Sequence, residues 1–345
     1  MTRQQRLELL CALGDWLKSG ADEGFQAAAL MAEAENPWFT QDHIAAAVNA
    51  IATQMLDANR LRNWLAAYPD HGRNHPHSTI GIVMAGNIPL VGFYDWLCVF
   101  ASGRRAKVKL SDKDKRLLPQ LTAWMGRAAH ESWAYTEFVG DDEPLREFDA
   151  VIATGSNNTA RYFEQYFAKY PHIIRRNRHG VALLTGEESA ADLYALGRDV
   201  FAYFGLGCRN VSKLYVPRGY DFDLLLEALH EYRDIALHNK YKNNFDYNLT
   251  LYILNNRPYR NNGCILLVED ESLSSRIASL HYAFYDHPAE VAQSLAQIRD
   301  QIQVVATNTP LPGLPCVPFG QTQSPGLLDY PDGVDVMAFL AGLDG

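Results

Sequence analysis

The stretch TIGIVMAGNIPLVGFYDWLCVFASGRRAKVKLS (residues 79–111) decides the fold. Its first eight residues form a short β-rich apolar run that ends in Gly86. The next 17 residues, 87–103, are typical of a helix, and RAKVKLS (105–111) has the composition of a second strand. Strand, helix and strand in this order predict two parallel strands joined by a right-handed crossover.

The same alternation continues along the chain and predicts an α/β fold with mostly parallel sheets. Residues 1–70 are expected to be helical, with Thr40 as a candidate N-cap. Further strands are expected at 147–156, 180–186, 213–217, 248–255, 264–270, 276–286 and 302–308, and further helices at 115–132, 157–170, 190–205 and 221–237. We expect two packed α/β domains: residues 1–180 with the N-terminal helices and a dinucleotide-binding domain, and 181–320 with the catalytic residues. Residues 321–345 are expected to pack back on the core.

Composition indicates a globular protein of the cytoplasm. The formal net charge of −9 disfavours a general nucleic-acid binder, and no apolar run has the roughly 18 residues that span a bilayer. Five scattered cysteines form no CxxC pair and no disulfide framework, which indicates a reducing compartment. Three histidines, His71, His75 and His77, lie in a polar loop without supporting metal ligands, so no metal site is expected.

Cys208 is the candidate nucleophile. It lies in AYFGLGCRNVSKLYVP (202–217), after two glycines that let the backbone approach a ligand. Arg209 and Lys213 are near in sequence and would favour a thiolate, the reactive form of cysteine. The simpler alternative is an inert core thiol. Cys11 and Cys98 are interpreted as packing residues, and neither Cys264 nor Cys316 has a clear partner.

Polar residues follow three predicted strands, at the edge where open α/β sheets bind ligands. They are Asn87 after the first strand, Lys107, Lys109 and Ser111 on the second, and Thr154, Gly155 and Ser156 at the end of the third. A Gly-Ser pair at a helix N-terminus can bind a phosphate. Asp112 and Asp114 are expected on the alternate register, pointing away, and the alternative is that the strand ends before them. Each signal is weak alone, and the absence of GxGxxG disfavours an ordinary Rossmann dehydrogenase.

The order of these features resembles the aldehyde dehydrogenase superfamily, and most closely its LuxC-like fatty acyl-CoA reductases. Asn87, the lysine strand 22 residues later, the TGS turn, the Gly-flanked cysteine and FGQTQSPGLLDYPDGVDVMAFL (319–340) carry the resemblance, from about residue 79 to the end. It implies that Cys208 is the nucleophile and that Asn87 helps to bind the oxyanion. It also implies that Lys109 with Ser111 contacts the adenosine ribose, and that Gly155 and Ser156 lie near the pyrophosphate.

One departure from the superfamily pattern bears on the reaction. Oxidative members have a Glu-Leu-Gly-Gly motif about 34 residues before the cysteine, whose glutamate activates the hydrolytic water. Here Ile174 or Arg175 stands at that place, and Glu187 and Glu188 come too late. The resemblance therefore implies a CoA-dependent reductase, in which a thiol exchanges with the acyl group. Glu271 is a loose match for a superfamily glutamate near the nicotinamide ribose, and a solvated acidic loop is an equal alternative.

The sequence thus predicts NADPH-dependent reduction of an acyl thioester to an aldehyde through a Cys208 acyl-enzyme. NADPH is expected because Lys107 and Lys109 share a strand face that would suit a 2′-phosphate, with Lys113 and Lys115 close by in sequence. The alternative is that these lysines form a solvated charge run before the next helix. The expected partners are acyl-CoA or acyl-carrier protein, and a homodimer or an acyl-transfer enzyme is possible. The alternatives are an aldehyde or semialdehyde dehydrogenase of the same fold, a Cys acyltransferase without a dinucleotide, and a silent scaffold.

Overall fold

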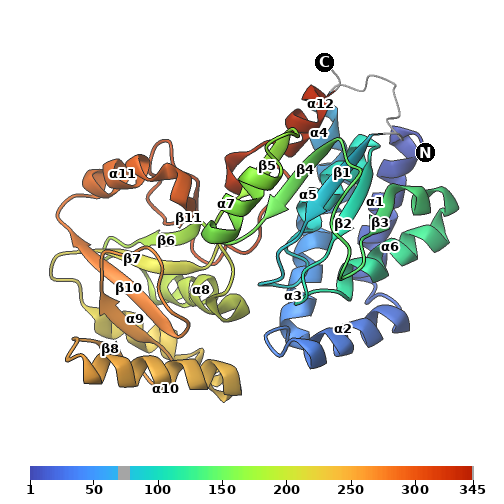
Figure 1. Cartoon of the computed structure of the whole chain (residues 1–345). Coiled ribbons are helices and arrows are strands. Elements are labelled where there is room, and N and C mark those ends of the chain that lie inside the picture. Colours follow the sequence, from blue (N-terminus) through green and yellow to red (C-terminus); the bar gives the residue numbers. More distant parts are fainter. Residues whose placement is uncertain (69–77, 344–345) are drawn as a thin grey trace. The chain divides into compact units, whose positions relative to one another are not determined.

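A computed structural model of the chain describes residues 1–68 and 78–343, and the three loop histidines His71, His75 and His77 lie outside these ranges. The chain divides into two compact units (Figure 1). Unit 1 comprises Met1–Asn177 and Pro325–Gly345, and unit 2 comprises Arg178–Ser324. Each unit is built around one sheet, so the predicted α/β class is confirmed.

Unit 1 holds a five-stranded parallel sheet in the order β3-β2-β1-β4-β5. Its strands are β1 (Thr79–Val83), β2 (Arg105–Lys109), β3 (Thr136–Phe138), β4 (Ala150–Thr154) and β5 (His172–Arg175). Its helices are α1 (Arg3–Lys18), α2 (Glu23–Glu35), α3 (Gln41–Ala50), α4 (Ala58–Ala66), α5 (Phe93–Ser102), α6 (Leu117–Ala128), α7 (Asn157–Tyr166) and α12 (Val336–Gly342). The strand order reverses between β1 and β4, and open α/β sheets bind ligands at the carboxyl ends of such strands.

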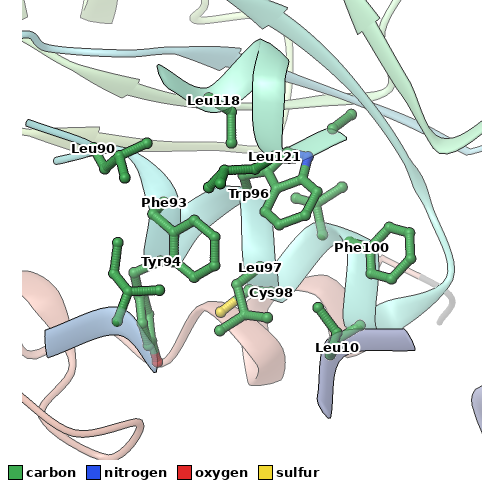
Figure 2. Close-up of a cluster of buried hydrophobic side chains, with 14 of the residues drawn as sticks. Leu10, Leu90, Phe93, Tyr94, Trp96, Leu97, Cys98, Phe100, Leu118 and Leu121 are labelled. Carbon is green, nitrogen blue, oxygen red and sulfur yellow. The ribbon is translucent and has the colours of Figure 1, made fainter. Parts of the chain in front are cut away.

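The core of unit 1 forms around α5, which is buried along its whole length. Trp96, Leu97 and Cys98 have no exposed surface, and Figure 2 shows them among Phe93, Phe100, Leu118 and Leu121. A helix that is apolar on all sides needs cover on all sides. Strands, the N-terminal helices and α12 supply that cover.

Unit 2 holds a seven-stranded sheet in the order β12-β11-β6-β7-β10-β9-β8, parallel except for the β8–β9 pair. Its strands are β6 (His179–Leu183), β7 (Val211–Pro217), β8 (Arg260–Asn261), β9 (Leu266–Glu269), β10 (Ser279–Tyr285), β11 (Ile302–Ala306) and β12 (Cys316–Val317). Its helices are α8 (Ala190–Phe201), α9 (Phe222–His230), α10 (Asn239–Leu254) and α11 (Pro288–Gln297).

One expected strand is wrong. Residues 248–255 were expected to be extended, but they form the end of α10 and the residue after it. The buried residues of α10 are Tyr241, Phe245, Asn248 and Tyr252, which recur at helical spacing. The apolar residues Ile253 and Leu254, which suggested a strand, are exposed on this helix.

Candidate active site

Cys208 lies in a turn between α8 and β7, after an unusual run of backbone conformations. Tyr203, Phe204 and Gly205 have φ values of 50°, 56° and 77°, all in the left-handed region. Such angles are strained for Tyr and Phe. Both side chains are buried and help to hold the backbone in place, and the N–H of Leu206 closes the turn on the Tyr203 carbonyl at 3.1 Å. Of the five free cysteines, Cys208 is the exposed one.

Asn210 fixes the turn from within. Its Oδ1 accepts a hydrogen bond from the N–H of Gly207 at 2.8 Å, and its Nδ2 donates to the carbonyl oxygens of Ala202 at 2.8 Å and Asp199 at 3.0 Å. Gly180 on β6 passes so close that a Cβ there would lie 2.5 Å from the Asn210 carbonyl oxygen. The Cys208 turn is thus built with little freedom, which suits a group that must meet a substrate in one geometry.

The segment Gly320–Thr322 is tied to the same turn. The Nε of Arg209 donates to the Thr322 carbonyl. The carboxylate of Asp199 accepts from the N–H groups of Gly320 at 2.6 Å and Thr322 at 3.0 Å, and from the Thr322 hydroxyl at 2.9 Å. Burial raises the pKa of Asp199, although these donors oppose the rise. This part of the C-terminal segment 319–340 therefore supports the Cys208 turn.

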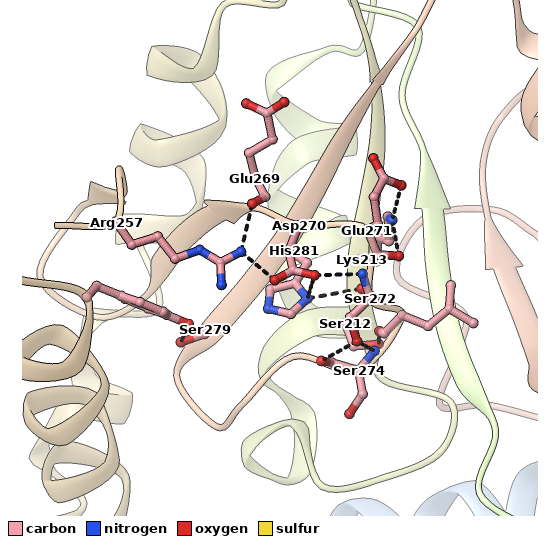
Figure 3. Close-up of polar contacts among 12 residues, drawn as sticks. Ser212, Lys213, Arg257, Glu269, Asp270, Glu271, Ser272, Ser274, Ser279 and His281 are labelled. Carbon is pink, nitrogen blue, oxygen red and sulfur yellow. Dashed lines mark hydrogen bonds and ion pairs between the residues drawn. The ribbon is translucent and has the colours of Figure 1, made fainter. Parts of the chain in front are cut away.

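Lys213 has a different contact from the one expected. Its side chain is 1% exposed, and its Nζ donates to the Glu271 carbonyl oxygen at 2.7 Å and lies 3.4 Å from the Glu271 carboxylate (Figure 3). Burial lowers the pKa of Lys213, and Glu271 partly compensates. Its charge is therefore used to hold the segment that carries Glu271.

Three side chains hold consecutive carbonyl groups of that segment (Figure 3). Lys213 contacts the carbonyl of Glu271, His281 Nδ1 lies 3.0 Å from that of Ser272, and Ser212 Oγ donates to that of Leu273 at 2.6 Å. Burial lowers the pKa of His281, so at neutral pH its ring is uncharged and donates from Nδ1. The Glu271 side chain itself is 94% exposed, so its carboxylate is open to solvent while it lies 3.4 Å from Lys213 Nζ.

In unit 1, Asn87 lies in the turn that follows β1. Lys109 ends β2, and its Nζ donates to the carbonyl oxygens of Gly140 at 2.6 Å, Asp141 at 2.5 Å and Glu143 at 2.9 Å. Lys107 projects from the same strand and pairs with Glu137 at 3.3 Å and Glu147 at 3.6 Å. A 2′-phosphate would compete with these partners.

Two carboxylates expected to point away behave differently from each other. The strand ends at Lys109, and Ser111 turns the chain back through an isolated bridge to Asp114. Asp112 is exposed and pairs with Lys115 at 3.0 Å. Asp114 is buried and accepts a hydrogen bond from the N–H of Leu90 at 2.8 Å; because the strand ends before both residues, their directions do not follow the register of β2.

The end of β4 fits a phosphate. Thr154 ends the strand, Gly155 follows, and Ser156 is the N-cap of α7, where its Oγ accepts from the Thr159 N–H at 3.2 Å. A Cβ on Gly155 would lie 2.9 Å from Thr159 and 3.0 Å from Phe163. The glycine is therefore required by packing against α7, and the exposed first turn of that helix offers N–H groups and a positive end.

Arg175 stands near the position that holds the hydrolytic glutamate in the superfamily pattern. In this chain it has a structural role. Its guanidinium forms a two-pronged ion pair with Asp95 at 2.6 and 3.0 Å and donates to the Pro331 carbonyl at 2.6 Å. Burial opposes this charge, but the attraction of Asp95 outweighs it and raises the pKa of Arg175. Ile174 beside it is half-buried and apolar, so neither residue supplies a general base.

Sequence reasoning missed the contacts of Asn210, Asp199 and Asp114. Asn210 had a signal, because an asparagine two residues after Cys208 can bond to its own turn. Asp199 and Asp114 had none, since their partners lie 121 and 24 residues away. Within the described residues no cluster of His, Cys, Asp or Glu is arranged to bind a metal, and no helix has the length and apolarity to cross a membrane.

Comparison with protein-family models and with curated protein sequences gave no match. Solved structures did match. Aldehyde dehydrogenase from Bacillus cereus, in an NAD+ complex, superposes with a TM-score of 0.61 at 15% identity, over 90% of this chain and 72% of that one. This chain has the aldehyde dehydrogenase fold. Aldehyde dehydrogenase 21 from Physcomitrella patens, in complex with succinate, gives 0.67 at 11% identity over 100% and 84%.

A third relative by fold is aldehyde dehydrogenase C from Pseudomonas syringae, solved with NAD+ and octanal. Its TM-score is 0.59 at 15% identity, over 90% of this chain and 78% of that one. These likenesses confirm the predicted fold class. The LuxC-like branch, which the sequence resemblance favoured, is not represented among these three structures.

Proposed function

We propose that this chain is an NADPH-dependent oxidoreductase that reduces an acyl thioester to an aldehyde through a thioester on Cys208. The observation that carries the proposal is the exposed Cys208 in a turn fixed by Asn210, Arg209 and Gly180. An exposed thiol in a turn that is held by this many contacts is typical of a nucleophile and unlike a packing cysteine. Cys98, which has no exposed surface, shows the contrast, because burial strongly raises its pKa.

The proposed reaction begins with attack of the Cys208 thiolate on the thioester carbonyl. In the proposal, the side-chain amide of Asn87 and the N–H of Cys208 donate to the oxyanion that this attack forms, and one such donor is worth about 3 kcal/mol. Collapse of the oxyanion breaks the C–S bond to the carrier, and the carrier thiolate leaves. A bound dinucleotide supplies the hydride. The resulting thiohemiacetal then releases the aldehyde and restores the thiolate. The donor carrier, CoA or acyl-carrier protein, is the expected partner.

The cofactor assignment rests on the carboxyl ends of the strands in unit 1. The strand order reverses between β1 and β4, and Gly155 and Ser156 open α7 toward solvent at that point. Thr154, Gly155 and Ser156 would hold the pyrophosphate, Lys109 and Ser111 the adenosine ribose, and Glu271 the nicotinamide ribose. Lys107 and Lys109 favour NADPH because they are cations on one face of β2.

A second candidate is oxidation of an aldehyde to an acid. Its support is the fold, because the matching structures are named as aldehyde dehydrogenases. The residues at 174 and 175 oppose it, since Arg175 is buried against Asp95 and Ile174 is apolar. Without a base for the hydrolytic water, the acyl-enzyme should persist until a thiol removes it.

One experiment separates the two candidates. The chain is incubated with a medium-chain acyl-CoA in the absence of dinucleotide, and the adduct is mapped by mass spectrometry. We expect one acyl group, on Cys208, that survives in buffer and is removed by added CoA. Cys208→Ser should give no thioester, and Cys264→Ser is the matched control. Rapid hydrolysis to the acid would favour the dehydrogenase, and an adduct on another cysteine would refute the assignment.

A further inference from the structure

The turn after β1 rests directly on the segment Ser111–Asp114. A Cβ on Gly86 would lie 2.6 Å from Ser111 Oγ and 3.1 Å from the Cβ of Lys113, so the side chains of this segment pack closely against the Gly86 backbone. Four residues later, the N–H of Leu90 donates to Asp114 Oδ2 at 2.8 Å. Pro89 has no N–H to donate. The Leu90 N–H is therefore the donor by which Asp114 holds the far end of the turn that carries Asn87.

Leu90 has an uncommon backbone conformation. Its φ is +56°, in the left-handed region that a leucine rarely adopts. The side chain is 5% exposed and lies in the core near Phe93 and Leu118 (Figure 2). The buried side chain and the Asp114 hydrogen bond constrain the residue from two directions. A strained backbone conformation of this kind persists only where several surrounding contacts hold it, and such residues are concentrated at functional sites.

Asp114 is itself costly to bury. Its side chain is 8% exposed, and its Oδ1 has no partner within hydrogen-bond distance among residues 1–68 and 78–343. Burial raises the pKa of Asp114 to about 6, and the N–H groups of Leu90 and of Leu117, at the start of α6, limit the rise. The hydrogen bond between Leu90 and Asp114 thus joins a strained backbone to a poorly solvated carboxylate. Leu90 lies three residues after Asn87.

We propose that Asp114 is a positioning residue, which holds Leu90 in its left-handed conformation at the end of the turn Asn87–Leu90 and so fixes the direction of the Asn87 amide. The inference rests on the proposed role of Asn87 as an oxyanion donor. Asp114 acts only through that turn and touches no substrate. A donor to an oxyanion loses most of its effect when it moves from its preorganised position. Loss of the Leu90 contact should therefore slow acyl transfer at Cys208.

The test is a double-mutant cycle on the rate of Cys208 acylation by acyl-CoA, measured under single-turnover conditions. Asn87→Ala should lower the rate by about 100-fold, and Asp114→Ala by roughly 10- to 50-fold. Asp114→Asn keeps an acceptor oxygen and should lose less. If Asp114 acts through Asn87, then Asp114→Ala should cost less than about 2-fold in the Asn87→Ala background. A merely structural role predicts the same loss in both backgrounds.

Two controls make the result specific. Asp57→Asn removes a carboxylate that accepts hydrogen bonds from the N–H groups of Asn59 and Arg60 at the start of α4. Because this carboxylate caps a helix that is a different element from the turn Asn87–Leu90, the substitution should leave acylation unchanged. Affinity for NADPH, followed by intrinsic fluorescence, should stay within about 2-fold in every variant. If Asp114→Ala does not fold, Asp114→Asn is carried through the same cycle.

The outcomes separate the inference from the function on which it rests. Additive losses at Asn87 and Asp114 would overturn the positioning role of Asp114 and leave the role of Asn87 intact. A normal rate for Asn87→Ala would overturn both. Unchanged acylation in Asp114→Ala, with Asn87→Ala slow, would show that the turn holds its shape without the carboxylate.

Discussion

Asp114 should make the stability of the chain depend on pH in an unusual direction. Its pKa is about 6 in the folded chain, against about 3.9 for an unperturbed aspartate. Between these values the folded state binds more protons than the unfolded state. The Asp114 contribution to the free energy of unfolding is therefore largest below about pH 4, falls as pH rises to about 6, and is constant above it.

Asp114→Asn should remove this dependence. Relative to the native chain, the variant should gain up to about 3 kcal/mol between pH 4 and pH 7.5, the free-energy equivalent of the pKa difference. Neighbouring cations contribute little, because Lys115 is directed at Asp112 and Asp141, and Arg116 at Glu35. Urea denaturation of both chains at the two pH values measures the difference. An equal pH dependence in both chains would show that Asp114 is not protonated in this range.

Single residues show where sequence reasoning succeeds and where it stops. Cys208 is exposed, which agrees with the partly open setting that its glycine neighbours suggested and not with the alternative of an inert core thiol. The contacts of Lys109 and Lys213 did not follow, since each binds carbonyl groups of a segment distant in sequence. The sequence shows that a side chain is positively charged, but the group that it contacts depends on the tertiary fold.

At the level of elements, the segment 270–275 should depend on Lys213. Lys213→Met keeps a long apolar side chain in the site but removes the donor to the Glu271 carbonyl. Removal of the buried charge should stabilise the chain, and loss of its hydrogen bond should destabilise it. We therefore expect the free energy of unfolding to change by no more than about 1.5 kcal/mol. The N–H groups of 270–275 should exchange with deuterium faster, and NADPH affinity should fall if Glu271 contacts the cofactor.

Lys242→Met is the matched control, because Lys242 is a half-exposed lysine that pairs with Asp246 on the surface of α10. It should change neither the exchange of 270–275 nor NADPH affinity. Slow exchange retained in Lys213→Met would mean that His281 and Ser212 suffice to hold the segment.

The elements that the sequence predicted well each have a clear pattern. β1 and α5 are apolar and buried over most of their length, and β2 alternates buried side chains with more exposed ones, which is the period of a strand. The prediction of a strand at 248–255 was wrong because α10 is half-exposed and has few apolar residues on its buried face. The short strands β3, β8 and β12 had no pattern to detect, since two or three residues carry no period.

At the level of the whole molecule, the alternation of strands and helices predicted the α/β class, and the structure divides the chain into two units. The strand order could not be derived from the sequence. It depends on which strands pair, and parallel pairs such as β1 with β4 join segments about 70 residues apart. The order places the ends of β1 and β4 together, and the candidate cofactor residues of unit 1 follow from that placement.

The C-terminal segment belongs to unit 1, and its helix α12 should be essential to that unit. Val336 and Leu340 have no exposed surface, and α12 packs against the central helix α5. Hydrogen bonds extend the attachment: Tyr94 donates to the Leu327 carbonyl at 3.0 Å, and Tyr68 donates to the Asp335 carboxylate at 2.9 Å. The segment thus covers apolar surface of α5 that would otherwise meet water.

Leu340→Ala tests this role, because it leaves a cavity at a fully buried position without altering the helix cap at Asp335. We expect a loss of about 2 to 5 kcal/mol in the free energy of unfolding, the range found for buried leucines. Ala341→Ser, on the exposed face of the same helix, should cost less than about 1 kcal/mol. Both are measured by urea denaturation followed by tryptophan fluorescence, since Trp96 lies in the α5 core. Equal stability of the two variants would mean that α12 adds little to the core of unit 1.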